Sequence, residues 1–168
     1  MTVPFKPPAV VLDELGITEP SEIDIEAIAE YCGATVLYEP LDGSAARILG
    51  RDDRAYITVD SKASPARQRF SAGHELGHWM RDRGKVAFAC TDRELENYWI
   101  DDHPERRANR YAADLLLPRK LFQPVARSMA PTFVSTRELA RTFTTSLIAT
   151  AIRLRNLSTS LRHRRALV

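Results

Sequence analysis

The chain has 168 residues, of which 44% are hydrophobic and 27% are charged, and its formal net charge is +2 at pH 7. This length and composition suit one globular domain and exclude disordered and fibrous proteins. The N-terminus has no apolar run of the signal-peptide kind, no stretch is apolar for long enough to span a bilayer, and two cysteines are too few for a disulfide framework. We therefore expect a single cytoplasmic domain without a membrane partner.

A helix is predicted near the N-terminus, with Asp24 or Ser21 as its N-cap and Gly33 at its end. Its apolar residues recur at helical spacing and form one stripe: Ile25, Ile28, Ala29 and Cys32. Cys32 on this stripe is expected to be a buried thiol, and Cys90 has no nearby Cys or His that would indicate a second metal site.

A small sheet is predicted after this helix. Residues 34–38 are rich in strand-forming side chains, and residues 47–49 and 55–59 flank a hairpin turn at residues 50–54. An exposed strand of such a sheet could pair with an extended substrate backbone. Strands that only cover the core fit the sequence equally well.

Residues 74–78 have the sequence H-E-L-G-H, which matches the H-E-x-x-H pattern of zinc peptidases. Residues four apart lie on one face of a helix, so His74 and His78 can bind the same metal ion. Glu75, one residue further along, can take a proton from a metal-bound water. We therefore predict one zinc ion per chain, with His74 and His78 as ligands and Glu75 as the catalytic base.

The surrounding residues favour a helix at this motif. Ser64 and Pro65 suit its N-cap and first position, and Gly84 suits its end. Gly73 and Gly77 each weaken a helix by about 1 kcal/mol relative to Ala, which indicates close approach of another backbone or a substrate. One face of the helix has the residues suited to burial: Ala72, Leu76, Trp79 and Met80.

A catalytic zinc site usually has a third protein ligand. The extended pattern with a third His fails here, because Arg81 stands where Gly is needed and Gly84 where the His is needed. Glu105 is the best alternative. Pro104 and Pro118 delimit a second helix, on which Glu105 shares a face with small residues that would let the two helices lie close together.

His103 competes with Glu105 for the third position, but it precedes the predicted helix, and an exposed loop histidine is the favoured interpretation. Asn109 shares the face of Glu105 and is placed to brace one of the metal ligands. Three residues are candidates for the hydrogen-bond donor to the oxyanion, and the sequence does not rank them: Tyr98, His103 and Tyr111.

The two motifs together resemble those of the ImmA/IrrE family of metallo-endopeptidases. The H-E-L-G-H segment is followed 27 residues later by E-R-R-A-N-R-Y-A-A-D-L-L-L-P, similar to the family's E-x-x-A-N-x-F-A-A-x-L-L-M-P. Tyr111 and Leu117 replace the usual Phe and Met, and the resemblance extends over roughly residues 25–157. It implies the following site: metal ligands His74, His78 and Glu105, and catalytic base Glu75.

The C-terminal third is predicted to be helical. Residues 135–138 have the capping-box pattern, and residues 144–146 suit a turn before a second helix at residues 147–157. The pair looks like a helix-turn-helix, and residues 139–168 are basic and contain no acid, a composition that also suits nucleic-acid binding. The low net charge of the whole chain favours a structural helical pair with a solvated basic tail, so direct nucleic-acid binding is not expected.

We predict a single α+β metallopeptidase domain, in which a small zincin-like antiparallel sheet packs on the H-E-x-x-H helix. Its parts are a catalytic core at residues 20–118, a helical, helix-turn-helix-like part at residues 119–158 and a basic tail at residues 159–168. The predicted function is that of a zinc-dependent endopeptidase. The resemblance implies a helix-turn-helix repressor of a mobile element, stress response or toxin–antitoxin system as substrate. The alternative is a noncatalytic regulatory protein that binds a repressor or DNA.

Overall fold

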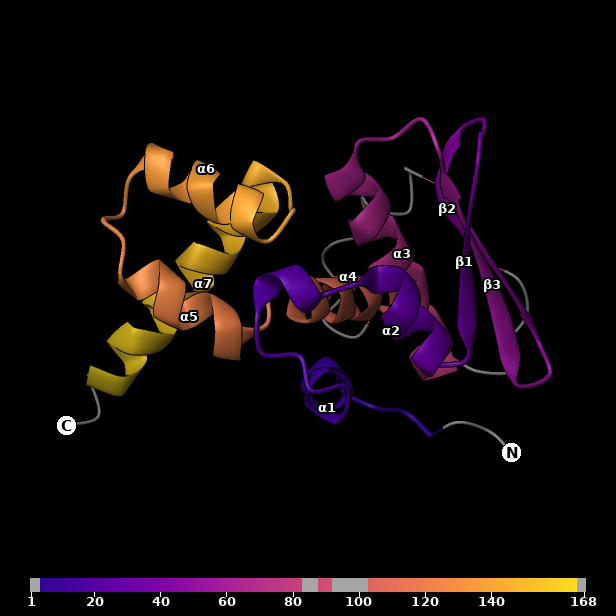
Figure 1. The fold of residues 1–168 in the computed structure, drawn as a ribbon, viewed down its shortest axis with the longest axis horizontal. Helices are drawn as coiled ribbons and strands as arrows, with labels where there is room; N and C mark the ends of the chain where they lie inside the picture. The colour runs from indigo at the N-terminus through magenta and orange to yellow at the C-terminus, as the bar shows by residue number, and fades with distance from the viewer. Residues whose placement is uncertain (1–3, 83–87, 92–102, 166–168) are drawn as a thin grey trace.

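A computed structural model describes residues 4–82, 88–91 and 103–165 of the chain (Figure 1). The strands are β1 (Ala34–Glu39), β2 (Ser44–Arg51), β3 (Arg54–Asp60) and β4 (Phe88–Thr91). The helices are α1 (Pro8–Glu14), α2 (Ile25–Tyr31), α3 (Pro65–Asp82), α4 (Pro104–Leu116), α5 (Arg119–Arg127), α6 (Phe133–Thr142) and α7 (Leu147–Arg165), with a short 3₁₀ turn, η1, at Pro20–Glu22. The predicted α+β class is confirmed.

The strands form one sheet in the order β1-β3-β2-β4. Strand β2 runs antiparallel to both β3 and β4, and its hairpin with β3 brings Arg51 opposite Arg54 at the predicted turn. Strand β1 runs parallel to β3, so the sheet is mixed and the predicted antiparallel sheet is wrong in this pairing. Strand β3 takes a central place because its side chains suit burial on both faces: Ile57 and Val59 are fully buried, and even Thr58 is only 8% exposed.

Helix α2 begins at the predicted cap and packs against α3. The Asp24 carboxylate accepts the backbone N–H groups of Glu26 and Ala27 at 3.0 and 3.1 Å. Cys32 is buried, as predicted, and its carbonyl accepts a hydrogen bond from the Trp79 indole at 3.0 Å. This bond ties the end of α2 to α3.

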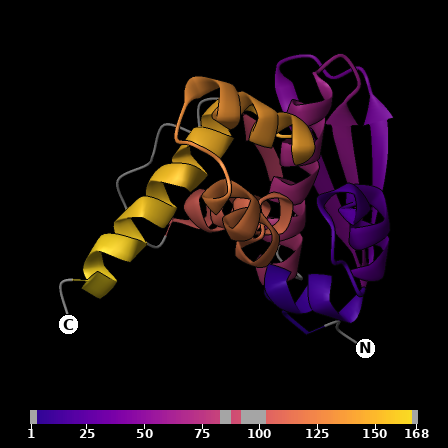
Figure 2. The same ribbon diagram turned by 60° about the vertical axis from the view of Figure 1, so that its left-hand side comes forward.

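Helix α3 lies between the sheet and α4 (Figures 1 and 2). The face predicted to be buried lies in the core, with every member at most 5% exposed: Ala72, Leu76, Trp79 and Met80. Gly84, the predicted end of this helix, lies outside the described residues.

Helices α3 and α4 approach each other most closely at Gly77. A Cβ atom added there would lie 2.9 Å from Tyr111 Cβ and 3.0 Å from Ala108 Cα, which is closer than side chains pack. A Cβ atom on Gly73 would lie 3.4 Å from Ala112, an ordinary contact. The missing side chain at Gly77 and the small residues of α4 therefore allow the close helix contact predicted from the sequence.

Helices α5, α6 and α7 lie on the side of the molecule away from the sheet (Figure 1). Phe122 of α5 and Phe143 after α6 pack edge-on, with ring centroids 5.3 Å apart, and both are buried. Arg153 of α7 donates to the Leu117 carbonyl at 2.9 Å and to the Asp114 carboxylate at 2.8 Å. These bonds tie α7 to the end of α4.

Helix α6 begins earlier than predicted. Its N-cap is Thr132, whose hydroxyl accepts the backbone N–H of Ser135 at 3.1 Å. The predicted capping box at residues 135–138 therefore lies inside the helix and is wrong as a helix start. Thr is a somewhat weaker N-cap than Ser, but a helix that starts after Thr132 has additional backbone hydrogen bonds.

Helix α7 is longer than predicted and extends to Arg165, because no Gly or Pro interrupts it after residue 147. The segment predicted as a tail, residues 159–168, is thus helical over its first part. Helices α6 and α7 pack on each other across the predicted turn at residues 144–146. A helix-turn-helix role for this pair stays a prediction.

Helix α1 and strand β4 were absent from the sequence-based prediction. Helix α1 is short, begins directly after Pro7 and buries few side chains, so its apolar pattern is weak. Strand β4 has four residues and lies at the edge of the sheet beside β2. Among the described residues, no helix combines the length and apolar character needed to cross a membrane.

Candidate metal centre

Helix α3 places His74 and His78 one turn apart, on the side that meets α4. Both side chains are nearly buried, and their Nε2 atoms lie 3.1 Å apart. The rings meet edge-on, with centroids 4.8 Å apart. The helix therefore directs two imidazole nitrogens to one point.

Helix α4 brings Glu105 to the same point. Its Oε2 atom lies 3.0 Å from His74 Nε2, and its Oε1 atom lies 3.0 Å from His78 Nε2. Among the described residues, these three form a group whose potential ligand atoms all lie within 4.8 Å of one another. The three residues predicted as ligands thus lie together.

The spacing of these atoms suits one metal ion. Zinc binds His nitrogen and carboxylate oxygen at about 2.0–2.2 Å, so tetrahedral ligand atoms stand about 3.3 Å apart. The observed separations of 3.0–3.1 Å are only slightly shorter. Two imidazoles and one carboxylate also leave a fourth position for water, as catalytic zinc sites require.

His103 is the N-cap of α4 and is not a member of this group within the described part of the chain. Its Nδ1 atom accepts the backbone N–H of Glu105 at 3.3 Å. It is half-buried, and the predicted exposed loop histidine is therefore wrong. The capping bond holds the first turn of α4, and with it Glu105, in place.

The histidines also set the charge state of Glu105. Burial alone would raise the pKa of this carboxyl group, but hydrogen bonds from His74 and His78 outweigh burial and hold the pKa well below its usual range. The carboxylate is therefore ionised, which is the form that binds a metal ion.

Asn109 orients His74 from the next turn of α4. His74 Nδ1 lies 2.9 Å from Asn109 Oδ1. An amide oxygen only accepts hydrogen bonds, so Nδ1 carries the proton and donates it. A metal ion would displace the Nε2 proton that His74 shares with Glu105, and the neutral ring would then offer its Nε2 lone pair to the ion. The Asn109 contact suits the bracing role predicted for this residue.

Glu75 follows His74 on α3, about 100° further round the helix axis. It is 1% exposed, although glutamates are almost never fully buried without a specific partner or role. A buried carboxylate next to His74 in the chain suits the predicted general base, and its role as that base stays a prediction.

The three oxyanion candidates differ in what the structure shows of them. The Tyr111 hydroxyl donates to the Lys6 carbonyl at 3.3 Å, which occupies its proton. Because His103 Nδ1 accepts a backbone N–H, the neutral ring carries its own proton on Nε2. Tyr98 lies outside the described residues.

Comparison with known proteins gives three findings. A family model described as the IrrE N-terminal-like domain (Peptidase_M78) matches residues 29–155. The Radiation response metalloprotease IrrE of Deinococcus deserti is 30% identical over 99 residues, which are 55% of this chain and 35% of that protein. The solved structure of a Mycobacterium tuberculosis transcriptional regulator matches 85% of this chain and 43% of its own, with a TM-score of 0.59 and 16% identity.

The structural match shows a likeness of fold alone. The chain spans about a third of the length of the Deinococcus relative that it matches. The family model covers most of the chain, including both helices of the metal centre and the clustered side chains His74, His78 and Glu105. The chain therefore belongs to the ImmA/IrrE family of metalloprotease domains, as its two motifs predicted.

Proposed function

We propose that this protein is a zinc-dependent endopeptidase. The observation that carries the proposal is the convergence of His74, His78 and Glu105 on one point. Glu75, the residue after His74, is buried. Two imidazoles and a carboxylate are the donor set of many catalytic zinc sites. The Deinococcus relative is a metalloprotease by name, which agrees with the proposal.

A bound zinc ion supplies a Lewis acid for the scissile carbonyl and a position for the attacking water. Glu75 accepts a proton from that water as the new C–O bond forms. It then passes the proton to the amine nitrogen as the C–N bond breaks. Because Glu75 is almost completely buried, bulk water competes little for this proton.

Strand β4 offers an edge at which an extended substrate can bind. It pairs with β2 on one side, and the structure describes no strand on its other side. Substrates that add to such an edge gain main-chain hydrogen bonds without a specific sequence. Specificity must then come from other surfaces of the enzyme.

The substrate that we propose is a helix-turn-helix repressor of a mobile element, a stress response or a toxin–antitoxin system. The resemblance to the ImmA/IrrE family supports this choice, because its members act on repressors of this kind. A transcriptional regulator also shares the fold of this chain, which agrees with a role in transcriptional control.

The variant Glu75→Gln tests the proposed reaction. Gln is nearly isosteric with Glu and cannot act as a base, so the fold and the zinc content should persist while proteolysis falls by a factor of at least roughly 100. The measurements are metal content by mass spectrometry and fragment formation from the substrate. A variant that cuts as fast as the wild type would contradict the role of Glu75.

A noncatalytic regulatory protein is the second candidate. The observation in its favour is the charge of residues 119–168, which have ten Lys and Arg residues but only one acid, Glu138. In that case the Glu75→Gln variant would retain the full biological effect, because repressor or DNA binding does not need a general base.

A further inference from the structure

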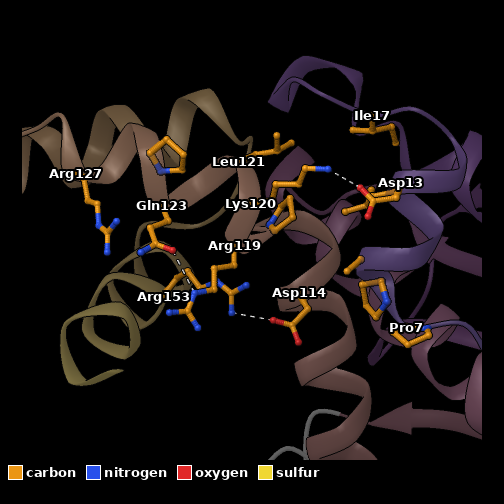
Figure 3. Close-up of a pocket in the computed structure, with 15 residues that line it drawn as sticks. Pro7, Asp13, Ile17, Asp114, Arg119, Lys120, Leu121, Gln123, Arg127 and Arg153 are labelled. Carbon is orange, nitrogen blue, oxygen red and sulfur yellow. Dashed lines mark hydrogen bonds and ion pairs between the residues drawn. The ribbon is translucent and has the colours of Figure 1, made fainter. Parts of the chain in front are cut away.

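Helix α5 separates two grooves on the C-terminal side of the molecule. The first, of about 650 Å³, lies between α1, the end of α4, α5 and α7 (Figure 3). The second, of about 460 Å³, lies between α5, α6 and α7. Gln123 and Arg127 of α5 line both grooves, so the two form one continuous surface, which we call the α5 surface.

Two ion pairs neutralise the carboxylates of the first groove. Lys120 lies 2.7 Å from Asp13, and Arg153 lies 2.8 Å from Asp114 (Figure 3). These pairs join α5 to α1 and α7 to α4, so they hold the walls of the groove together. The remaining wall is largely apolar and rich in proline: Pro7, Pro8, Leu12, Ile17, Pro118 and Leu121.

Arg119 and Arg127 add two further positive charges to this groove. The Arg127 side chain makes no hydrogen bond or ion pair with the part of the chain that the structure describes. It stands where the two grooves meet. A carboxylate from a ligand could accept two parallel hydrogen bonds from its guanidinium there.

The second groove is mainly apolar. Its lining includes the apolar residues Met129, Leu154 and Leu157. Phe133 also lines this groove, and 64% of its surface is exposed. Ile148, in the first turn of α7, is 73% exposed. Exposed large apolar side chains beside arginines are typical of protein interfaces, whereas nucleic-acid interfaces are more polar.

The charge of the chain is divided between its two parts. Residues 119–168 have ten basic residues and one acid, whereas residues 1–118 have 14 basic residues and 21 acids. The C-terminal helices therefore attract acidic partners, and the rest of the molecule repels them.

We propose that the α5 surface docks an acidic segment of the protein substrate, in which a carboxylate side chain has apolar residues on both sides. The carboxylate binds Arg127, and the apolar residues enter the two grooves. That this segment belongs to the substrate rests on the proposed peptidase function; the docking itself does not.

The near edge of this surface lies close enough to the metal centre for a substrate to bind at both. Glu105 lies in the first turn of α4, and Asp114, which lines the first groove, lies nine residues further along the same helix, or about 13 Å at 1.5 Å per residue. An extended chain covers such a distance with about four residues. Docking at α5 therefore positions a substrate without occupying the metal ligands.

The test uses the full chain with Glu75→Gln, so that no peptide is cut. Its backbone amide signals are followed by NMR during titration with a short peptide that has two central glutamates between pairs of leucines. The matched peptide has lysines in place of the glutamates. We expect the shifts to map to α1, α5, α6 and α7, with the glutamate peptide binding at least about tenfold more tightly.

Two charge reversals locate the site. Arg127→Glu should weaken the glutamate peptide by about tenfold or more and improve the lysine peptide. Arg51→Glu is the matched control, because Arg51 lies at the β2–β3 hairpin with an 87% exposed side chain. This control should leave both affinities unchanged.

Several results would overturn the proposal. They are equal binding of the two peptides, no effect of Arg127→Glu, or shifts confined to other elements. Tighter binding of decanoate than of the peptide would indicate a site for small amphiphiles instead. Tighter binding of duplex DNA, or dimerisation of the chain through these helices, would assign the surface to nucleic acid or to a second copy.

The same samples separate this inference from the proposed function. Peptide docking on a zinc protein that cuts no substrate would refute the peptidase and leave the docking intact. If the protein cuts its substrate with zinc, if Arg127→Glu does not slow this cleavage and if no peptide docks, the docking proposal would be refuted and the peptidase would stand.

Discussion

Asn109 decides which nitrogen of His74 faces the metal centre. Its amide oxygen accepts the Nδ1 proton at 2.9 Å, so that Nε2 is the nitrogen near Glu105. Partners of this kind orient metal ligands, and their loss commonly lowers metal affinity by 10–100-fold. At the scale of single residues, the site therefore depends on Asn109 as well as on its ligands.

We predict that Asn109→Ala lowers zinc affinity by about 10–100-fold, because the His74 ring loses its orienting acceptor. Asn109→Asp keeps an acceptor oxygen at the same place and should bind zinc nearly as well as the wild type. Competition with a chromogenic chelator measures both affinities. Equal losses in the two variants would mean that Asn109 acts through packing and not through its hydrogen bond.

The ligands themselves give a second prediction. His74→Ala and Glu105→Ala should each reduce zinc content from about one per chain to a small fraction, because catalytic sites rarely tolerate the loss of one of three ligands. His103→Ala should keep its zinc and lose about 1 kcal/mol of stability, since it removes only the cap of α4. Metal loss in the His103 variant, with metal retained in the Glu105 variant, would reverse the assignment.

At the scale of elements, the site depends on how closely α4 lies against α3. His74 and His78 are on one helix and Glu105 on the other, so a small separation of the helices opens the cluster. The close contact is at Gly77, next to His78. Packing between these helices therefore holds the three side chains together.

We predict that Gly77→Ala destabilises the protein by about 1–3 kcal/mol and lowers its zinc affinity, because the new methyl group meets Tyr111 at 2.9 Å. Gly73→Ala is the control on the same helix. Its methyl group would make an ordinary contact at 3.4 Å, and the higher helix propensity of Ala should leave stability unchanged or increased. Thermal unfolding with and without zinc compares the two variants. Similar melting temperatures would argue against close packing at Gly77.

At the scale of the whole molecule, the metal centre and the C-terminal helices form one body. The sheet and α3 lie on one side, α5 to α7 on the other, and Arg153 connects α7 with the end of α4 (Figure 2). The two parts carry opposite net charges, so an acidic partner is attracted to the C-terminal helices and repelled by the rest of the molecule.

We predict that the protein makes a single cut in a helix-turn-helix repressor encoded in its own operon. We expect little digestion of an unfolded protein such as casein. Backbone pairing at a sheet edge does not distinguish one substrate sequence from another. Recognition by a charged surface would therefore limit which proteins are cut. Fragment mapping by mass spectrometry identifies the cut, and raising the salt concentration should slow it. Efficient digestion of casein, or an intact repressor beside active enzyme, would contradict this narrow specificity.

The sequence by itself determined the features that depend on neighbouring residues. The i, i+4 spacing of His74 and His78, the Asp24 cap and the hairpin between β2 and β3 follow from local backbone geometry, and the structure has all of them. Glu105 is predicted partly from its helix and partly from a family resemblance, because no local rule brings it to histidines 27 and 31 residues away.

The tertiary structure alone decided the features that depend on long-range packing. Strand β1 pairs in parallel with β3, a long-range pairing that no turn signal records. This pairing places β3 between β1 and β2, where Ile57 and Val59 are buried. His103 is the N-cap of α4 and not the exposed loop histidine predicted from the sequence, because the backbone N–H groups of the first helical turn need an acceptor. The α5 surface combines residues from Pro7 to Ser158, and only the packing of α1, α5, α6 and α7 brings them together.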